Sequence, residues 1–167
     1  MPAPTTLSRL LEFRDTLTSP ITDGVRVVLS SGGAAGGVIS EGMGYALLLA
    51  GLGMSSTERG TPGWKASVQF GEEIFAGWRR MCELTRNSCQ DDTSLFCGAR
   101  LRRNQDALPG FAPCLPAWKF DNKLRAQQSS GSATDGDEDA LLGMILMISA
   151  SDAESWPLWK SAVRCAL

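Results

Sequence analysis

The chain has 167 residues, of which 43% are hydrophobic and 20% charged, and its formal net charge is −2 at pH 7. These values are typical of one globular domain, and they argue against a nucleic acid or another polyanion as partner, because such partners require a basic face. No apolar run reaches the roughly 18 to 20 residues that span a bilayer, so we expect no membrane partner.

The first half of the chain is predicted to hold two helices. Apolar residues at near-helical spacing indicate a helix from Leu7 to Leu17, with Thr6 as its cap, and the β-branched stretch from Asp23 to Ser31 favours extended structure. The glycine-rich residues 30–37 indicate a turn, and no Gly-Lys-Ser/Thr follows that would suggest phosphate binding. Ser40 is expected to cap a helix from Glu41 to Met54 that is apolar nearly all round and therefore buried.

The second half continues the pattern. A helix is predicted from Trp64 to Thr85, with core positions at Val68, Phe70, Ile74, Phe75, Trp78 and Met81. Residues 86–116 form a long loop with several prolines. Helices follow from Asp137 to Ala150, again apolar all round after an acidic start, and from Glu154 to Ala166, with Trp156, Trp159 and Val163 inward. The pattern as a whole predicts an all-α fold.

The composition restricts the chemistry. There is no histidine, which removes Ser-His-Asp and Cys-His hydrolysis and leaves carboxylates, lysine, tyrosine or cysteine for acid–base work. No C-x2-C spacing is present, so we expect neither a zinc site nor a cofactor. The cysteines are odd in number, and both disulfides and buried thiols remain open for them: Cys82, Cys89, Cys97, Cys114 and Cys165.

Two segments place acidic residues beside glycine where an apolar helix is expected to begin. They are Ser40–Tyr45, with the sequence Ser-Glu-Gly-Met-Gly-Tyr, and Ser132–Asp137, with the sequence Ser-Ala-Thr-Asp-Gly-Asp. A carboxylate at a helix start is common, because it meets unpaired amides and the positive end of the helix dipole. A pair of such carboxylates is also the minimum equipment for acid–base hydrolysis of a glycosidic bond.

Both segments resemble those of family 8 of the glycoside hydrolases, once called cellulase family D. Ser40–Tyr45 matches its S-E-G-M-G-Y segment, Ser132–Asp137 its S-A-T-D-[GA]-D segment, and Ala117–Asp121 between them is similar to its W-[RK]-[IVF]-D stretch. The resemblance implies an (α/α)6 barrel of alternating inner and outer helices. It covers only the N-terminal part of a catalytic domain of roughly twice this length, so residues 1–167 are expected to be one truncated domain with exposed inner-ring faces.

The resemblance also assigns roles. Glu41 is implied to be the general acid that protonates the leaving oxygen, and Asp135 to orient the sugar at the cleaved bond. A plain position at the helix start is the alternative for Glu41. Asp137 is a candidate for substrate binding, although it and Asp139 are also expected to cap their helix, with Gly136 permitting a tight turn.

The aromatic residues add a second set of candidates. Trp118 is a candidate platform for a sugar ring, with a place in the core as the alternative, and Tyr45 is a further candidate contact. The remaining tryptophans, at helical spacing, are expected in the core: Trp64, Trp78, Trp156 and Trp159.

The implied function is inverting endo-hydrolysis of β-1,4-linked glucan such as cellulose, without cofactor. Chitosan, xylan and mixed-linkage glucan remain open as substrates, and a non-catalytic carbohydrate-binding remnant or an inactive fragment is the alternative. The general base of the family comes from its later half, beyond Leu167, so a missing C-terminal half is an expected partner. The family implies an extracellular location, whereas the stretch Met1–Leu7 shows no signal peptide.

Overall fold

The computed structural model describes residues 5–31, 36–88, 115–129 and 131–151. Within these ranges the chain is predominantly helical, which confirms the expected class in its coarse form, but it also contains two small two-stranded sheets. The elements are α1 (Thr6–Leu17), β1 (Thr18–Thr22), β2 (Val25–Val28), β3 (Gly37–Ile39), α2 (Ser40–Ser56), α3 (Pro62–Ser88), β4 (Lys119–Asp121) and α5 (Thr134–Ala150).

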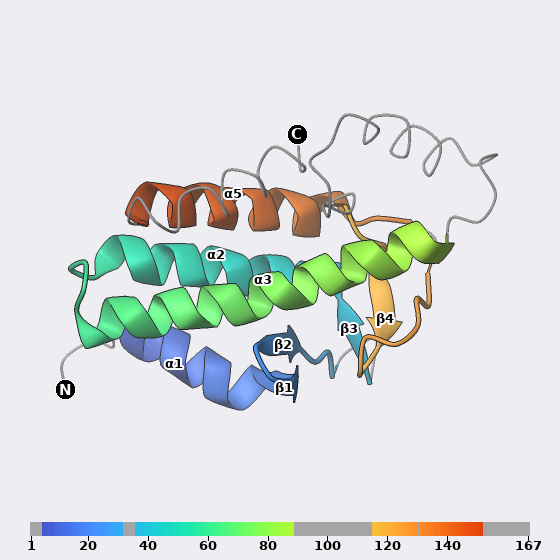
Figure 1. Ribbon diagram of the computed structural model, residues 1–167, viewed down its shortest axis with the longest axis horizontal. Helices are drawn as coiled ribbons and strands as arrows, with labels where there is room; N and C mark the ends of the chain where they lie inside the picture. The colour runs from blue at the N-terminus through green and yellow to red at the C-terminus, as the bar shows by residue number, and fades with distance from the viewer. Residues whose placement is uncertain (1–4, 32–35, 89–114, 130, 152–167) are drawn as a thin grey trace.

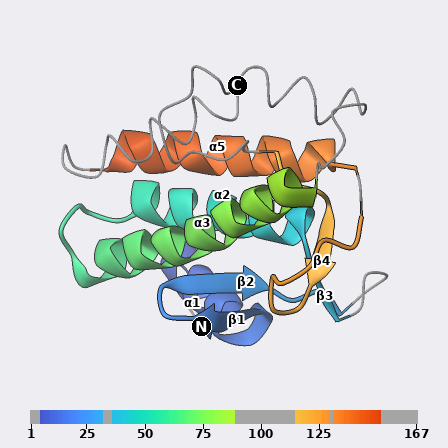
Figure 2. The same ribbon diagram turned by 45° about the vertical axis from the view of Figure 1, so that its right-hand side comes forward.

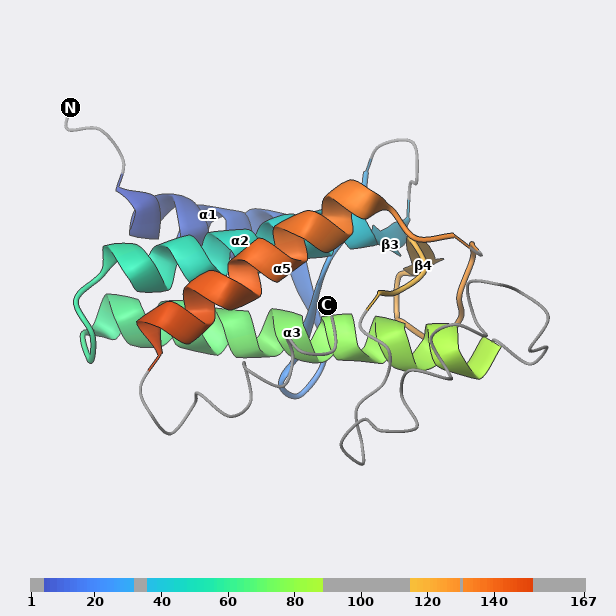
Figure 3. The same ribbon diagram turned by 90° about the horizontal axis from the view of Figure 1, so that it is seen from above.

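The helices are stacked in layers along one long direction. α5 lies above α2 and α3, while α1 and the β1–β2 hairpin lie below them (Figure 1). Seen from above, α5 crosses α2 at an angle (Figure 3). α2 and α5 run in the same direction, so that both N-termini lie at the end of the molecule where β3 and β4 pair (Figure 2).

α1 begins one residue earlier than expected. Its cap is Thr5, whose side-chain oxygen accepts a hydrogen bond from the backbone N–H of Ser8 at 3.2 Å, and the predicted cap Thr6 is the first helical residue. Leu10 is buried, and the ring of Phe13 meets Phe70 of α3 edge to face at 6.4 Å. One apolar stripe of α1 therefore covers α3, as amphipathic spacing predicts.

α3 carries most of the predicted core. Five of its six predicted core positions are buried, and the sixth, Val68, is partly buried and packs against the core. The expected core places of Trp64 and Trp78 are confirmed. The indole N–H of Trp64 donates to the carbonyl of Ala150 at 3.2 Å, which ties the start of α3 to the end of α5.

α2 and α5 approach each other through glycines. A Cβ added at Gly143 would lie 2.5 Å from the backbone nitrogen of Leu48, and one at Gly51 would lie 2.7 Å from the carbonyl oxygen of Gly143. Closer to the N-termini, a Cβ at Gly44 would collide with the carbonyl oxygen of Gly136. Because the obstacles are backbone atoms, only glycine allows these two helices to lie so near.

The prediction that α2 and α5 are buried on every side was wrong. Tyr45 on α2 is 52% exposed and Leu142 on α5 is 48% exposed, and Leu52 and Ile145 are exposed as well. The expectation rested on composition alone, and a helix that is apolar all round gives no indication of which of its faces is covered by the rest of the protein. No helix in the described ranges is long and apolar enough to cross a membrane.

Both sheets are antiparallel pairs. β1 and β2 form a hairpin with Thr18 opposite Val28; β2 lies within the stretch expected to be extended, Asp23 to Ser31, whereas β1 precedes it and was not predicted. β3 pairs with β4, with Val38 opposite Phe120. The second pair matters for the site, because β3 leads directly into α2 and β4 begins directly after Trp118.

Several predicted boundaries shift. α3 continues to Ser88, so the helix extends into the expected loop 86–116, and α5 begins at Thr134 rather than Asp137. Residues 89–114 and the predicted helix Glu154–Ala166 lie outside the described residues. Cys82 is buried in α3. The other four cysteines lie outside the described residues, so whether the cysteines form disulfides or remain thiols is not tested.

Candidate functional site

The three segments that carry the resemblance meet at one end of the molecule. The backbone N–H of Ser40, at the start of α2, donates to the carbonyl of Trp118 at 2.9 Å. The N–H of Trp118 in turn donates to the carbonyl of Gly131 at 2.7 Å, just before α5. Pairing of β3 with β4 holds the first of these contacts in register, so the structure brings together residues that lie far apart in the sequence.

Glu41 and Asp135 form a carboxyl pair at this end. Each lies in the first turn of its helix, and their side chains are hydrogen bonded to each other. Gly136 makes this approach possible, since a Cβ there would lie 2.7 Å from the backbone nitrogen of Glu41. The expected tight turn at Gly136 was wrong: it is a helical residue, and its lack of a side chain serves close packing.

The neighbouring carboxyl group changes the acidity of Glu41. The hydrogen bond with Asp135 raises the pKa of Glu41 above 4.5, and burial and repulsion from the charge of Asp135 act in the same direction. The positive end of the α2 dipole acts in the opposite direction, because it favours the ionised carboxylate. A carboxyl group whose pKa is raised is better suited to donate a proton than an ordinary glutamate.

Asp137 lies one helical turn from Ala133, and its backbone N–H donates to the Ala133 carbonyl at 3.1 Å. Because α5 begins at Thr134 with Ala133 at the cap position, the expected capping roles of Asp137 and Asp139 were wrong. Asp135 is exposed, and its Oδ1 accepts the N–H of Gly136 at 2.9 Å.

The two candidate aromatic contacts both reach solvent near the carboxyl pair. Trp118 is 40% exposed, so the alternative of a core position does not hold, and the ammonium of Lys119 lies 5.9 Å from its ring centroid. Tyr45 follows Glu41 by one turn of α2, which places both on the same helix face. The site therefore combines an acid pair with exposed aromatic surface.

Ser40 is a residue whose place the sequence did not predict. It is the first residue of α2 rather than its cap, and Ile39 at the cap position makes no side-chain hydrogen bond. Its hydroxyl is fully buried and has no hydrogen-bond partner among the described residues. The sequence did contain a signal for Ser40, because it belongs to the same hexapeptide as Glu41. A serine before a helix usually indicates a cap, however, and that interpretation was preferred.

Within the described ranges, no group of three or more cysteine, aspartate or glutamate side chains is arranged to hold a metal ion. Comparison of the chain with family models, with curated proteins and with solved structures finds no match.

Proposed function

We propose that this chain is part of an inverting glycoside hydrolase of β-1,4-linked glucans, similar to family 8. The observation that carries the proposal is the Glu41–Asp135 pair. Two hexapeptides that were singled out separately place their carboxyl groups within hydrogen-bonding reach of each other, and the pKa of one is raised. Adjacent exposed aromatic side chains at Trp118 and Tyr45 are suited to stack on sugar rings.

In this proposal Glu41 donates its proton to the leaving glycosidic oxygen and Asp135 holds the sugar. The pair does not supply both acid and base. An inverting enzyme needs carboxyl groups about 6.5–9.5 Å apart to admit water, and a retaining one needs about 5–5.5 Å. Carboxyl groups in direct hydrogen bond are closer than either. The general base is therefore assigned to a residue other than Asp135.

The same reasoning bears on the proposed architecture. α2 and α5 are parallel, meet through glycines and carry exposed apolar residues such as Leu52 and Leu142. These features are those expected of two neighbouring inner helices of an (α/α)6 barrel. A C-terminal half of the domain is the partner that would cover those residues. We propose a secreted protein on the strength of the family resemblance.

A cellulose-like glucan is the proposed substrate, with chitosan, xylan and mixed-linkage glucan as the other members of the class. A carbohydrate-binding remnant without turnover is the second candidate. It is favoured by the same exposed Trp118 and by the direct hydrogen bond between the Glu41 and Asp135 carboxyl groups, which are too close to act as acid and base on one glycosidic bond.

The test combines binding and turnover. Purified chain is titrated with cello-, xylo- and chito-oligosaccharides, and reducing-sugar release is measured on carboxymethyl-cellulose, xylan and chitosan, with Glu41→Gln and Asp135→Asn as variants. We expect binding that Asp135→Asn weakens about tenfold, through a lost charge-assisted hydrogen bond, and little or no turnover. Turnover by the wild-type chain that Glu41→Gln abolishes would support the hydrolase, and it would refute the claim that this chain lacks the general base. Absence of binding to every oligosaccharide would overturn both candidates.

A further inference from the structure

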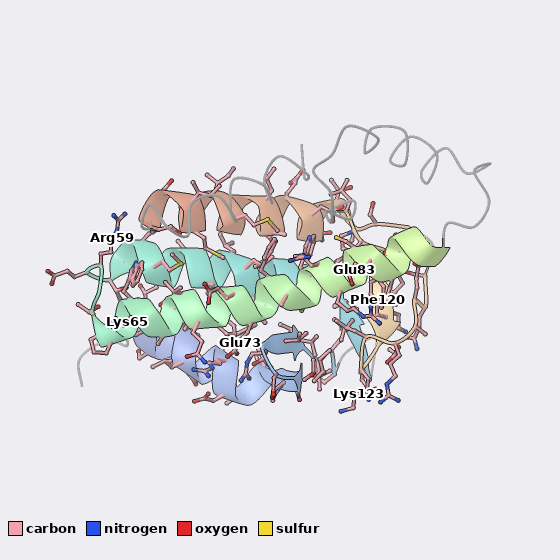
Figure 4. The ribbon with its side chains drawn as sticks, viewed as in Figure 1. Arg59, Lys65, Glu73, Glu83, Phe120 and Lys123 are labelled. Carbon is pink, nitrogen blue, oxygen red and sulfur yellow. The ribbon has the colours of Figure 1, made fainter. Side chains whose placement is uncertain are left out.

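A pocket lies away from the carboxyl pair, between the β1–β2 hairpin, the second half of α3 and the turn that follows β4. Its volume is about 410 Å³. Pockets of roughly 300–1,000 Å³ hold small organic ligands. Figure 4 labels Glu83 on α3 and Lys123 on the turn, which belong to two of its walls. None of the residues implied by the glycosidase resemblance lines it.

The lining of this pocket is strongly basic. Its lining includes Arg79 and Arg80 of α3 and Lys123 and Arg125 of the turn, and Glu83 is the one carboxylate among the described lining residues. Arg80 and Glu83 form an ion pair at 3.5 Å, with side chains 47% and 35% exposed, so Glu83 offsets one lining cation and the lining stays positively charged. A basic cluster of this kind is unexpected in a chain whose net charge is −2.

The turn that supplies two of the cations is firmly built. Both carboxylate oxygens of Asp121 accept backbone N–H groups, from Lys123 at 2.8 Å, from Arg125 at 2.8 Å and from Ala126. Leu124 takes a left-handed backbone conformation with φ of 49°, which is unfavourable for leucine. Its side chain is buried, while Lys123 and Arg125 on either side are exposed.

The hairpin wall is held equally closely. A Cβ at Gly77 of α3 would lie 2.5 Å from the carbonyl oxygen of Arg26, so β2 rests directly on α3. This contact brings Ile21 and Val25 to the pocket, where they line it together with Leu124. The pocket thus combines a partly apolar surface with a cationic rim, which suits a ligand that has a carbon body and one anionic group.

We propose that this pocket binds a small organic oxyanion, with the anionic group held by the arginine and lysine side chains and the carbon body resting on Ile21 and Val25. Guanidinium groups pair with phosphate and carboxylate oxygens in a bidentate manner, so a sugar phosphate and a sugar acid offer the same chemistry. The net charge argued against a polyanion partner, but a bulk value says nothing about a local cluster of four cations.

The test is a titration at low ionic strength with glucose 6-phosphate, glucuronate, inorganic phosphate and neutral glucose. We expect one of the two charged sugars to bind more tightly than inorganic phosphate, and glucose not to bind. Which charged sugar binds best identifies the anionic group. Lys123→Gln together with Arg125→Gln should weaken binding at least about tenfold, because two charge-assisted contacts are lost.

Two further variants make the test decisive. Arg59→Gln together with Lys65→Gln removes the same charge from two exposed residues, one in the connection before α3 and one in its first turn (Figure 4). This control should leave binding within about twofold, because those distant charges are screened. Glu83→Gln removes the one carboxylate among the described lining residues and should tighten binding. Failure of both charged sugars to bind, tighter binding of inorganic phosphate, or an equal loss in the Arg59 and Lys65 control would overturn the proposal.

Discussion

Substitution of Gly143 by alanine is the most direct perturbation of the α2–α5 interface. The added Cβ would lie 2.5 Å from the backbone nitrogen of Leu48, whereas ordinary contact begins at 3.4 Å, so the helices must separate by roughly 1 Å. A gap of about 0.5–1 Å forfeits a quarter to a half of the dispersion energy at each affected contact. Overpacking of this kind costs about 1–3 kcal/mol, while replacing a helical glycine returns up to about 1 kcal/mol.

The expected net loss is therefore about 1 kcal/mol of unfolding free energy, or about 2–4 °C in Tm for a domain of this size. Thermal and denaturant unfolding followed by far-ultraviolet circular dichroism measure it. Gly131→Ala is the matched control, since nothing lies within 4 Å of its added Cβ, and it should stay within about 0.5 kcal/mol. An unchanged or raised stability for Gly143→Ala would refute the close backbone contact between α2 and α5.

Three further predictions concern ionised groups, and each is checked by comparing Tm of variant and wild type across pH. The raised pKa of Glu41 makes its ionised form unfavourable to folding, so Glu41→Gln should raise Tm slightly at pH 7, and this gain should vanish below pH 4.5. A lowered Tm at pH 7 would contradict this. Burial raises the pKa of Glu73, but hydrogen bonds from Arg26 and Gln69 outweigh burial, so the pKa is lowered. Arg26→Gln breaks a 2.7 Å ion pair whose side chains are 14% and 16% exposed, and it should cost about 2 kcal/mol at pH 7 and less as the pH falls below 4.5. A loss of stability that does not depend on pH would contradict the ion pair. Burial likewise raises the pKa of Asp121, but its backbone hydrogen bonds outweigh burial, so the pKa is lowered. Asp121→Asn should therefore cost about 1–2 kcal/mol above pH 3.8, and the difference from wild type should close in stronger acid. No effect at neutral pH would show that these bonds do not hold the turn.

The helices were largely predictable because their apolar spacing is strong. The core positions of α3, such as Ile74 and Trp78, follow from periodicity alone. The strands were not predictable in the same way. β3 and β4 have three residues each, and such pairs are fixed by their position in the fold rather than by local sequence.

The contact between α2 and α5 also needed the structure. Gly44 and Gly51 on one helix and Gly136 and Gly143 on the other are each seven residues apart, which places each pair on one helix face. The sequence does not say which helix such a face meets. For the same reason it could not tell that Tyr45 and Leu142 are exposed, because nearly all their helical neighbours are equally apolar.

The candidate site was partly predictable. The two hexapeptides identified Glu41 and Asp135, but their mutual hydrogen bond depends on the parallel packing of helices that the sequence does not order. The basic pocket carries no motif. Its cations come from α3 and from the turn after β4, and their proximity is a property of the fold.

The most direct test of the central claim uses azide in place of water, because azide is a nucleophile that needs no general base. The chain is incubated with cellopentaose and azide, and the products are analysed by mass spectrometry and NMR. As the glycosidic C–O bond breaks, Glu41 passes its proton to the departing oxygen and azide forms a C–N bond at the opposite face of the anomeric carbon. We predict an α-glycosyl azide with the wild-type chain and none with Glu41→Gln. No azide product from the wild-type chain, or equal amounts from both, would contradict Glu41 as the acid.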